Sequence, residues 1–202
     1  MPEIIQDPYQ GIEPDRIWDR MFSGEVGGLE QVSPTTGKKG NFWSSVQNAL
    51  EDSKISNRLR GNEIIELGPG TCTRFRDYCV EKGAREYAGV DLFTSSDSIG
   101  QVIGSTRVRI FGDDAYRFLS KKSSDTAIIA QFLFLAKEIF EGQCKRIGIE
   151  PKTIAMALSR EIYRVQKHGE PFISFGTDEL FLEQLKHAGF VGDDNGIFFR
   201  KD

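Results

Sequence analysis

The stretch NEIIELGPGTCTRF, residues 62–75, runs from an apolar strand into a turn that contains two glycines. Glu66 stands just before these glycines, Gly68 and Gly70. Glycine costs backbone entropy and packs no side chain, so this pair indicates positive φ or the close approach of another group to the backbone. A tight strand-to-helix turn would explain the pattern, and so would a nucleotide-type cofactor resting on the turn.

From residue 62 onward, predicted strands and helices alternate along the chain. The strands span residues 63–67, 86–92, 107–111, 126–132, 171–175 and 196–201, and the helices span residues 73–82, 115–120, 135–143, 151–167 and 178–188. This alternation predicts an α/β fold, with a doubly wound, mostly parallel sheet and helices on both faces. Ligands of such sheets bind beyond the carboxyl ends of the strands, where the glycine turn would lie.

Residues 1–60 have a different pattern. Residues 14–22 read as a short amphipathic helix, residues 23–40 as a loop, and residues 41–61 as a helix capped by Asn41 and stopped by Gly61. Two such helices are too few to bury a core alone. We therefore expect residues 1–60 to form a helical cover, with a mobile lid at residues 23–40, on a domain that spans residues 61–202.

The composition is that of a globular chain, with 39% hydrophobic and 28% charged residues. The net charge of −4 provides no general attraction to nucleic acid or to anionic membranes. The first residues show no secretory signal, and the most apolar run, residues 126–136, is too short to span a bilayer. Three cysteines without CxxC spacing suit reduced thiols, so we expect a cytoplasmic protein without a metal site.

Two cofactor classes use a glycine turn in this position. A dinucleotide fold requires G-x-G-x-x-G, and Thr73 stands where its third glycine would be. The motif ELGPGT, residues 66–71, instead resembles the acidic-x-Gly-x-Gly motif of class I S-adenosylmethionine-dependent methyltransferases. One departure is Cys72, at a position where many members of that family carry another glycine.

Further segments resemble this family in the same order along residues 61–202. YAGVDLF (87–93) puts Asp91 at the end of the second strand, and FGDDAYRFL (111–119) puts Asp114 and Ala115 after the third. SDTAIIAQFLFL (124–135) is similar to the fourth-strand motif, LSREIYRVQKHGEPFISF (158–175) to the following helix and fifth strand, and LEQLKHAGF (182–190) to the last helix. The resemblance implies a seven-stranded sheet with an antiparallel closing strand.

The resemblance also implies S-adenosylmethionine as the cofactor. Asp91 would hold the ribose hydroxyls, and Asp114 with Ala115 would contact the adenine. Asp113 is the alternative to Asp114 for this contact, and Asp114 is favoured because an alanine follows it. Gln131 is either a cofactor or substrate contact or a core amide that is satisfied by the backbone. The implied cofactor contacts are Glu66, Gly68, Pro69, Gly70, Asp91, Leu92, Asp113, Asp114, Ala115 and Gln131.

The acceptor and the catalytic residues are less defined. Four aromatic residues before the first strand either seat helices on the sheet or line the substrate pocket: Trp18, Phe22, Phe42 and Trp43. No signature of amino-directed, cytosine-directed, arginine-directed or catechol-type methyltransferases is recognisable. By elimination, the expected acceptor is a small molecule. The alternatives are a methyltransferase of RNA or protein and a non-catalytic protein that binds S-adenosylmethionine.

Overall fold

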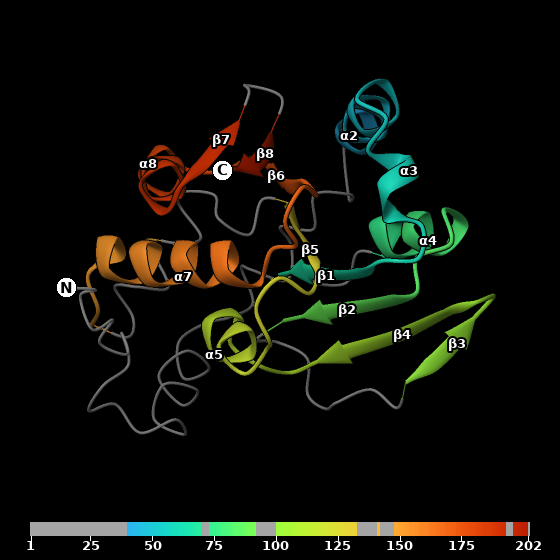
Figure 1. The fold of residues 1–202 in the computed structure, drawn as a ribbon, viewed down its shortest axis with the longest axis horizontal. Coiled ribbons are helices and arrows are strands. Elements are labelled where there is room, and N and C mark those ends of the chain that lie inside the picture. Colours follow the sequence, from blue (N-terminus) through green and yellow to red (C-terminus); the bar gives the residue numbers. More distant parts are fainter. Residues whose placement is uncertain are drawn as a thin grey trace.

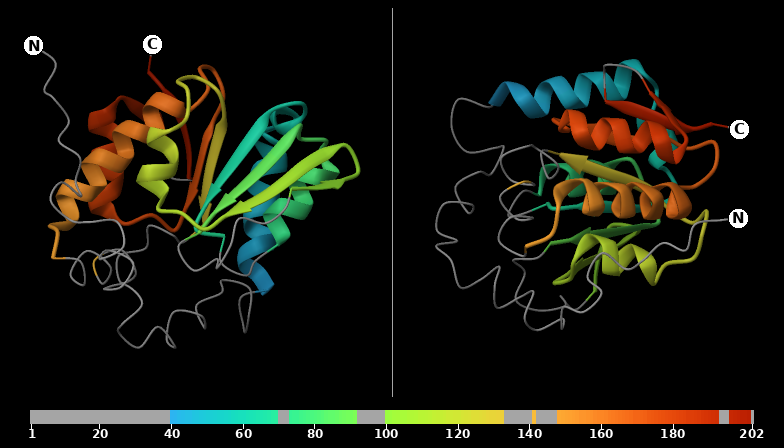
Figure 2. Two further views of the ribbon diagram at one scale, coloured as in Figure 1. Left: turned by 90° about the horizontal axis from the view of Figure 1, so that it is seen from below. Right: turned by 90° about the vertical axis from the view of Figure 1, so that its left-hand side faces the viewer.

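The structure, a computed structural model, describes residues 40–69, 73–91, 100–132, 141, 148–192 and 196–201 of the 202-residue chain. Within these residues a single twisted sheet lies between two layers of helices (Figures 1 and 2). Its strands are β1 (Glu63–Leu67), β2 (Glu86–Val90), β3 (Gln101–Ile103), β4 (Thr106–Phe111), β5 (Ile128–Phe132), β6 (Phe172–Phe175), β7 (Phe190–Gly192) and β8 (Ile197–Arg200).

The described strands follow the order β3-β4-β2-β1-β5-β6-β8-β7. Strands β4, β2, β1, β5 and β6 are mutually parallel, and β8 runs antiparallel to both β6 and β7. The order reverses at β1, because the chain proceeds outward to β2 and β4 and then returns to β5 on the other side. The predicted doubly wound α/β fold with an antiparallel closing strand is therefore confirmed.

The predicted number of seven strands is wrong, because the described sheet has eight. The additional edge strand, β3, forms an antiparallel hairpin with β4 across the residues Gly104 and Ser105. Gly104 has a φ of 62°, which suits the first position of a two-residue hairpin turn. The six individually predicted strands correspond to β1, β2, β4, β5, β6 and β8.

Helices cover both faces of the sheet. Helices α5 (Ala115–Ser120), α7 (Pro151–Val165) and α8 (Glu179–Ala188) lie on one face (Figure 1). The other face carries α2 (Gly40–Asp52), α3 (Ser56–Leu59) and α4 (Arg74–Glu81) (Figure 2). Of the predicted helices 14–22 and 135–143, only residue 141 lies among the described residues.

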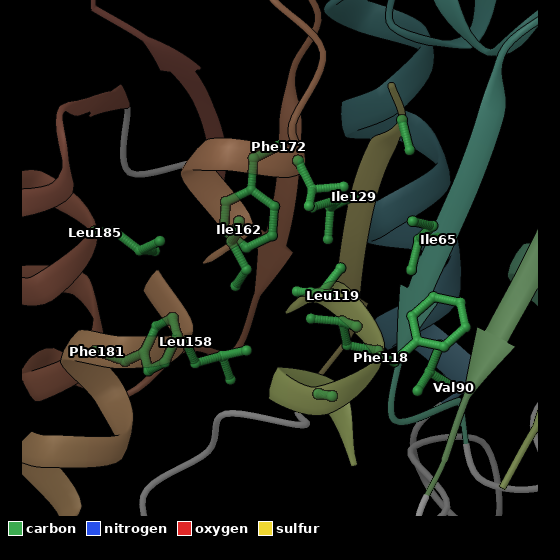
Figure 3. Close-up of a cluster of buried hydrophobic side chains, with 14 of the residues drawn as sticks. Ile65, Val90, Phe118, Leu119, Ile129, Leu158, Ile162, Phe172, Phe181 and Leu185 are labelled. Carbon is green, nitrogen blue, oxygen red and sulfur yellow. The ribbon is translucent and has the colours of Figure 1, made fainter. Parts of the chain in front are cut away.

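Successive residues of β1 point to opposite faces, which is why the strand reads as a continuous apolar run. Ile65 and Leu67 belong to the buried cluster beneath α5, α7 and α8, part of which Figure 3 shows with Ile162 and Phe172. Ile64 belongs to the cluster on the opposite face. That second cluster also contains four residues of α2, α3 and the turn between them: Val46, Leu50, Ile55 and Leu59.

The single helix predicted for residues 41–60 is two helices, and α2 begins at Gly40, one residue before the predicted cap Asn41. The chain leaves α2 through Lys54, which has a φ of 58°. The Ile55 N–H donates to the Leu50 carbonyl and the Lys54 N–H to the Glu51 carbonyl, each at 2.9 Å. This pair of bonds is a Schellman motif with a lysine at the left-handed position, and it redirects the chain into α3.

Replacing Leu50 tests whether α2 is part of the same cooperative unit as the sheet. Leu50 is fully buried, so Leu50→Ala should lower the free energy of unfolding by about 2–5 kcal/mol through lost burial and a cavity. Urea denaturation followed by circular dichroism measures the change. Asn48→Ala, at an exposed position of the same helix, is the matched control and should change stability by about 0.5 kcal/mol or less. Equal effects of the two substitutions would contradict the packing described here.

Candidate functional site at the carboxyl edge of the sheet

Four neighbouring parallel strands end at one edge of the sheet. Leu67 of β1 pairs with Val90 of β2 and with Gln131 of β5, and Val90 pairs with Phe111 of β4. The residues that follow these strand ends therefore lie side by side. They include five of the ten predicted cofactor contacts: Gly68, Pro69, Asp91, Asp113 and Asp114.

The glycine turn begins directly at the end of β1. Gly68 has a φ of 66°, in the left-handed region where a side chain is disfavoured, and its N–H donates to the Val90 carbonyl at 2.8 Å. This bond fixes the start of the turn against β2. Pro69 is buried. Gly70, like Leu92 of the predicted site, lies outside the described residues, so its predicted contact with a ligand stays a prediction.

Gly89 is a site residue that the sequence reasoning missed. It lies opposite Glu66 in the β1–β2 register. A Cβ atom at this position would lie 2.8 Å from Ile110 Cδ1 and 3.1 Å from Pro69 Cγ, which is closer than ordinary contact. A glycine inside a strand signals such a close approach, and here it allows the glycine turn to pack down onto β2.

Glu66 is buried on the face covered by α4, with 3% of its surface exposed. The hydroxyl of Tyr87, itself fully buried on β2, donates a hydrogen bond to the Glu66 carboxylate. The pKa of Glu66 is raised from 4.5 to about 8, chiefly by burial and also by the nearby charge of Asp91, while the Tyr87 hydrogen bond and the charge of Arg76 oppose the rise. At neutral pH this carboxyl is therefore mostly protonated.

Asp91 continues β2 by one residue. Its N–H donates to the Phe111 carbonyl at 3.0 Å, and only 7% of the residue is exposed. The backbone is thus held against β4, in the strand next to β1, at which the strand order reverses. This position agrees with the predicted strand-end location of Asp91, whereas its contact with a ribose is not tested by the structure.

Asp113 and Asp114 both organise the start of α5. Asp114 is its N-cap, and the carboxylate accepts a hydrogen bond from the Arg117 N–H at 3.0 Å. Asp113 accepts from the Asp114 N–H at 2.9 Å and forms an ion pair with the exposed Lys121 at 2.9 Å. Asp113 therefore lies nearer the surface, and Asp114, followed by the buried Ala115, lies nearer the strand ends.

Gln131 is fully buried, and its amide is held within the protein. Nε2 donates to Ser174 Oγ and to Thr177 Oγ1, both at 2.6 Å, and more weakly to the Phe175 carbonyl at 3.3 Å. The amide is thus held chiefly by two side chains and less by the backbone carbonyl that the second alternative expected, and a contact of Gln131 with a ligand stays a prediction. Ser174 and Thr177 were missed from the sequence, and a polar residue inside the apolar β5 run is the signal that points to such partners.

Trp43 is the one predicted substrate-side aromatic whose side chain is described. It is partly buried and packs edge-on against Phe75 at 6.3 Å, Tyr78 at 5.9 Å and Phe132 at 6.2 Å between ring centroids. These contacts show a packing role for Trp43, next to the last residue of β5. The side chains of Trp18, Phe22 and Phe42 lie outside the described residues.

Two further features concern the described part of the chain only. No group of three or more His, Cys, Asp or Glu side chains there could hold a metal ion. None of the helices there is long and apolar enough to cross a membrane.

Comparison with solved structures relates this fold to known proteins. The structure of 1,6-didemethyltoxoflavin-N1-methyltransferase from Burkholderia thailandensis, bound to 1,6-didemethyltoxoflavin and S-adenosylhomocysteine, superposes with a TM-score of 0.56. The identity is 12%, over 100% of this chain and 94% of that one. At this identity the likeness shows the fold alone: this chain shares the fold of that methyltransferase.

Two other similar structures have TM-scores too low to support an argument. They are a putative S-adenosylmethionine-dependent methyltransferase from Methanococcus maripaludis (TM-score 0.46, 14% identity, 92% and 94% coverage) and a putative hemolysin from Lactococcus lactis (0.45, 9%, 77% and 84%). No family model and no curated protein matches the sequence.

Gly89→Ala tests the close approach between the glycine turn and β2. The added methyl would meet Ile110 and Pro69, and such overpacking should cost about 1–3 kcal/mol of stability as the turn shifts. Gly100→Ala is the control. The atom nearest to its added Cβ would be Arg109 Cγ, at 3.1 Å, in a flexible side chain that can move away. Thermal and urea denaturation of both variants measure the difference, and a neutral Gly89→Ala would show that the turn does not rest on this strand.

Proposed function

We propose that this chain, which has the fold of an S-adenosylmethionine-dependent methyltransferase, binds S-adenosylmethionine at the carboxyl edge of its sheet and transfers the methyl group to a small-molecule acceptor. The observation that carries the proposal is that three features lie together at the carboxyl ends of the neighbouring strands β1 and β2. These are the buried acid Glu66, the left-handed turn at Gly68 and the strand-end Asp91. The sequence motif predicts a cofactor contact at each of these residues.

The residues at this edge fit the proposed cofactor. Gly89 leaves the glycine turn packed close to β2, and Gly68 presents backbone without a side chain. Asp91 offers an acceptor pair for the two ribose hydroxyls, and the Asp114–Ala115 segment at the start of α5 would face the adenine. The cofactor, when bound, supplies a methyl group that its sulfonium already activates for transfer.

The contribution of the chain is then to hold and orient the two reactants. Holding them in a reactive geometry is worth about 7–11 kcal/mol of the barrier, and this requires no dedicated catalytic side chain. A general base would add about 10²–10⁴-fold, and only for an acceptor that carries a proton at working pH. We therefore assign no residue as a base.

A small-molecule acceptor is supported by two observations. The net charge of −4 gives no general attraction to a phosphate backbone. The Burkholderia methyltransferase with the same fold is described as bound to 1,6-didemethyltoxoflavin, a small molecule. Methylation of RNA or protein and cofactor binding without catalysis are the alternatives, and a screen of acceptor classes with methyl-labelled S-adenosylmethionine distinguishes all three.

We also propose that residues 1–60 contribute the acceptor-side cover of the domain 61–202. The support comes from the described part of this segment. Val46 and Leu50 of α2 are buried in the core, and Trp43 reaches Phe132 at the carboxyl end of β5. The beginning of α2 therefore lies beside the strand ends at which the acceptor would approach.

The cofactor assignment predicts selective binding. Calorimetric titration should show binding of S-adenosylmethionine and S-adenosylhomocysteine and no heat with NAD, because the turn lacks the third glycine of a dinucleotide site. Binding of NAD without binding of S-adenosylmethionine would overturn the proposal.

Asp91→Ala should weaken cofactor binding while the protein stays folded. Loss of hydrogen bonds to an ionised acceptor costs about 1.5–3 kcal/mol, which corresponds to about 10–150-fold in Kd. Asp52→Ala is the matched control, since it removes the same charge from an exposed end of α2 and should leave Kd unchanged. An unaltered Kd in Asp91→Ala would show that Asp91 does not contact the cofactor and is an ordinary carboxylate at the end of a strand.

A further inference from the structure

Strand β6 ends beside β5, on the side of β1 that lies away from Asp91 and Asp114. Phe175, the last residue of β6, pairs in parallel register with Phe132, the last residue of β5. The segment that follows β6 therefore starts at the same carboxyl edge as the candidate site. Apart from Gln131 of β5, the predicted cofactor contacts lie in or after β1, β2 and β4. The β5–β6 side of the edge is thus the side on which we expect an acceptor to approach.

Asp178, three residues after the end of β6, has a carboxylate that the described fold leaves without a bond. It is the N-cap residue of α8, but its side chain forms no capping hydrogen bond. Among the described residues, its Oδ2 atom has no hydrogen-bond partner, although it is shielded from solvent. Asp114, the N-cap of α5, is the contrast, because its carboxylate accepts from the Arg117 N–H at 3.0 Å. A shielded acceptor without a donor is unfavourable, so helix capping does not explain an aspartate at this position.

The backbone next to Asp178 is held by side-chain hydrogen bonds. Thr177 Oγ1 and Ser174 Oγ both accept from Gln131 Nε2, each at 2.6 Å. Gly176, between these two residues, has a φ of 71°, which lets the chain turn sharply after β6. The Asp178 carboxylate therefore follows an anchored turn, and the donor that Oδ2 lacks would come from a bound molecule or from water.

We infer that Asp178 is a specificity-determining residue for the methyl acceptor, and that its carboxylate accepts a hydrogen bond from an N–H or O–H group of that acceptor, above all from an amine. The inference rests on the proposed function and names the class of its small-molecule acceptor. An ionised carboxylate only accepts hydrogen bonds, and a bond from an ammonium group is stronger than one from a neutral donor. A carboxylate or phosphate group of an acceptor would be repelled.

The aromatic rings at the two strand ends indicate the apolar part of such an acceptor. Phe132 and Phe175 stack with their ring centroids 6.0 Å apart and an interplanar angle of 12°, and Phe175 is only partly buried. A small aromatic molecule with one donor group combines the apolar and polar contacts that ligand sites offer. Benzylamine, benzyl alcohol and phenylacetate share one benzyl group and differ in the polar group, so they serve as matched probes.

Ligand-detected NMR titration of the full chain, saturated with S-adenosylhomocysteine at neutral pH, tests the inference. Benzylamine should bind about tenfold more tightly than phenylacetate, and benzyl alcohol should lie between them. Asp178→Asn keeps the size of the side chain and removes its charge, so it should weaken benzylamine binding about tenfold, as expected for one lost charge-assisted bond. Glu179→Gln is the matched control, since it removes a charge from the exposed neighbouring residue, and should leave all three affinities unchanged.

Urea denaturation separates this role from a structural one. Asp114→Ala should lower the denaturation midpoint, because it removes a formed cap, whereas Asp178→Ala should change the midpoint less. An equal drop in both variants would assign Asp178 a structural role instead.

The inference fails on its own if the wild-type chain binds S-adenosylhomocysteine but binds benzylamine no better than phenylacetate, or binds none of the probes. It fails equally if Asp178→Asn binds benzylamine as the wild type does. In each of these cases the cofactor assignment stands. A wild-type chain that binds neither S-adenosylmethionine nor S-adenosylhomocysteine would overturn the proposed function and, with it, this inference.

Discussion

The parallel pairing of β1 with β2 on one side and β5 on the other is the constraint on which the candidate site depends. It places Leu67, Val90 and Gln131 at the same level, so that the chain leaves each strand at one common edge. Because β1 is buried on both faces and hydrogen-bonded on both sides, its register is fixed strongly. A slip by one residue would exchange Ile65 and Leu67 with Glu66 and move the acid into the opposite cluster.

The same constraint explains why Glu66 and Gly89 are the positions where β1 and β2 depart from apolar packing. They face each other in register. A buried acid is unfavourable in a core, and a glycine weakens a strand. Both lie near the carboxyl ends of their strands, beside the candidate site, where burial raises the pKa of the acid and the glycine makes room for Pro69. The two unfavourable positions are thus both close to the candidate site.

Elements with a strong local signal could be predicted from the sequence. Helix α5 spans residues 115–120 as predicted, because Asp114 caps it. The strands β3 and β7 were missed, since three residues each carry little periodicity and pair only at the ends of the sheet. The break at Lys54 was missed because a lysine in the left-handed conformation follows from the packing of Leu50 and Ile55, not from its own preference.

The candidate site is predictable only where a motif residue has a single role. Asp114 has two, since it caps α5 through the Arg117 N–H and stands where a cofactor contact is expected. Replacing it would alter the helix as well as the binding surface, and a loss of affinity would not separate the two effects. Asp91 is the N-cap of none of the described helices, and its backbone is held by the bond to the Phe111 carbonyl. Its side chain can therefore be changed with the strand in place, which makes Asp91 the more informative of the two aspartates about the ligand.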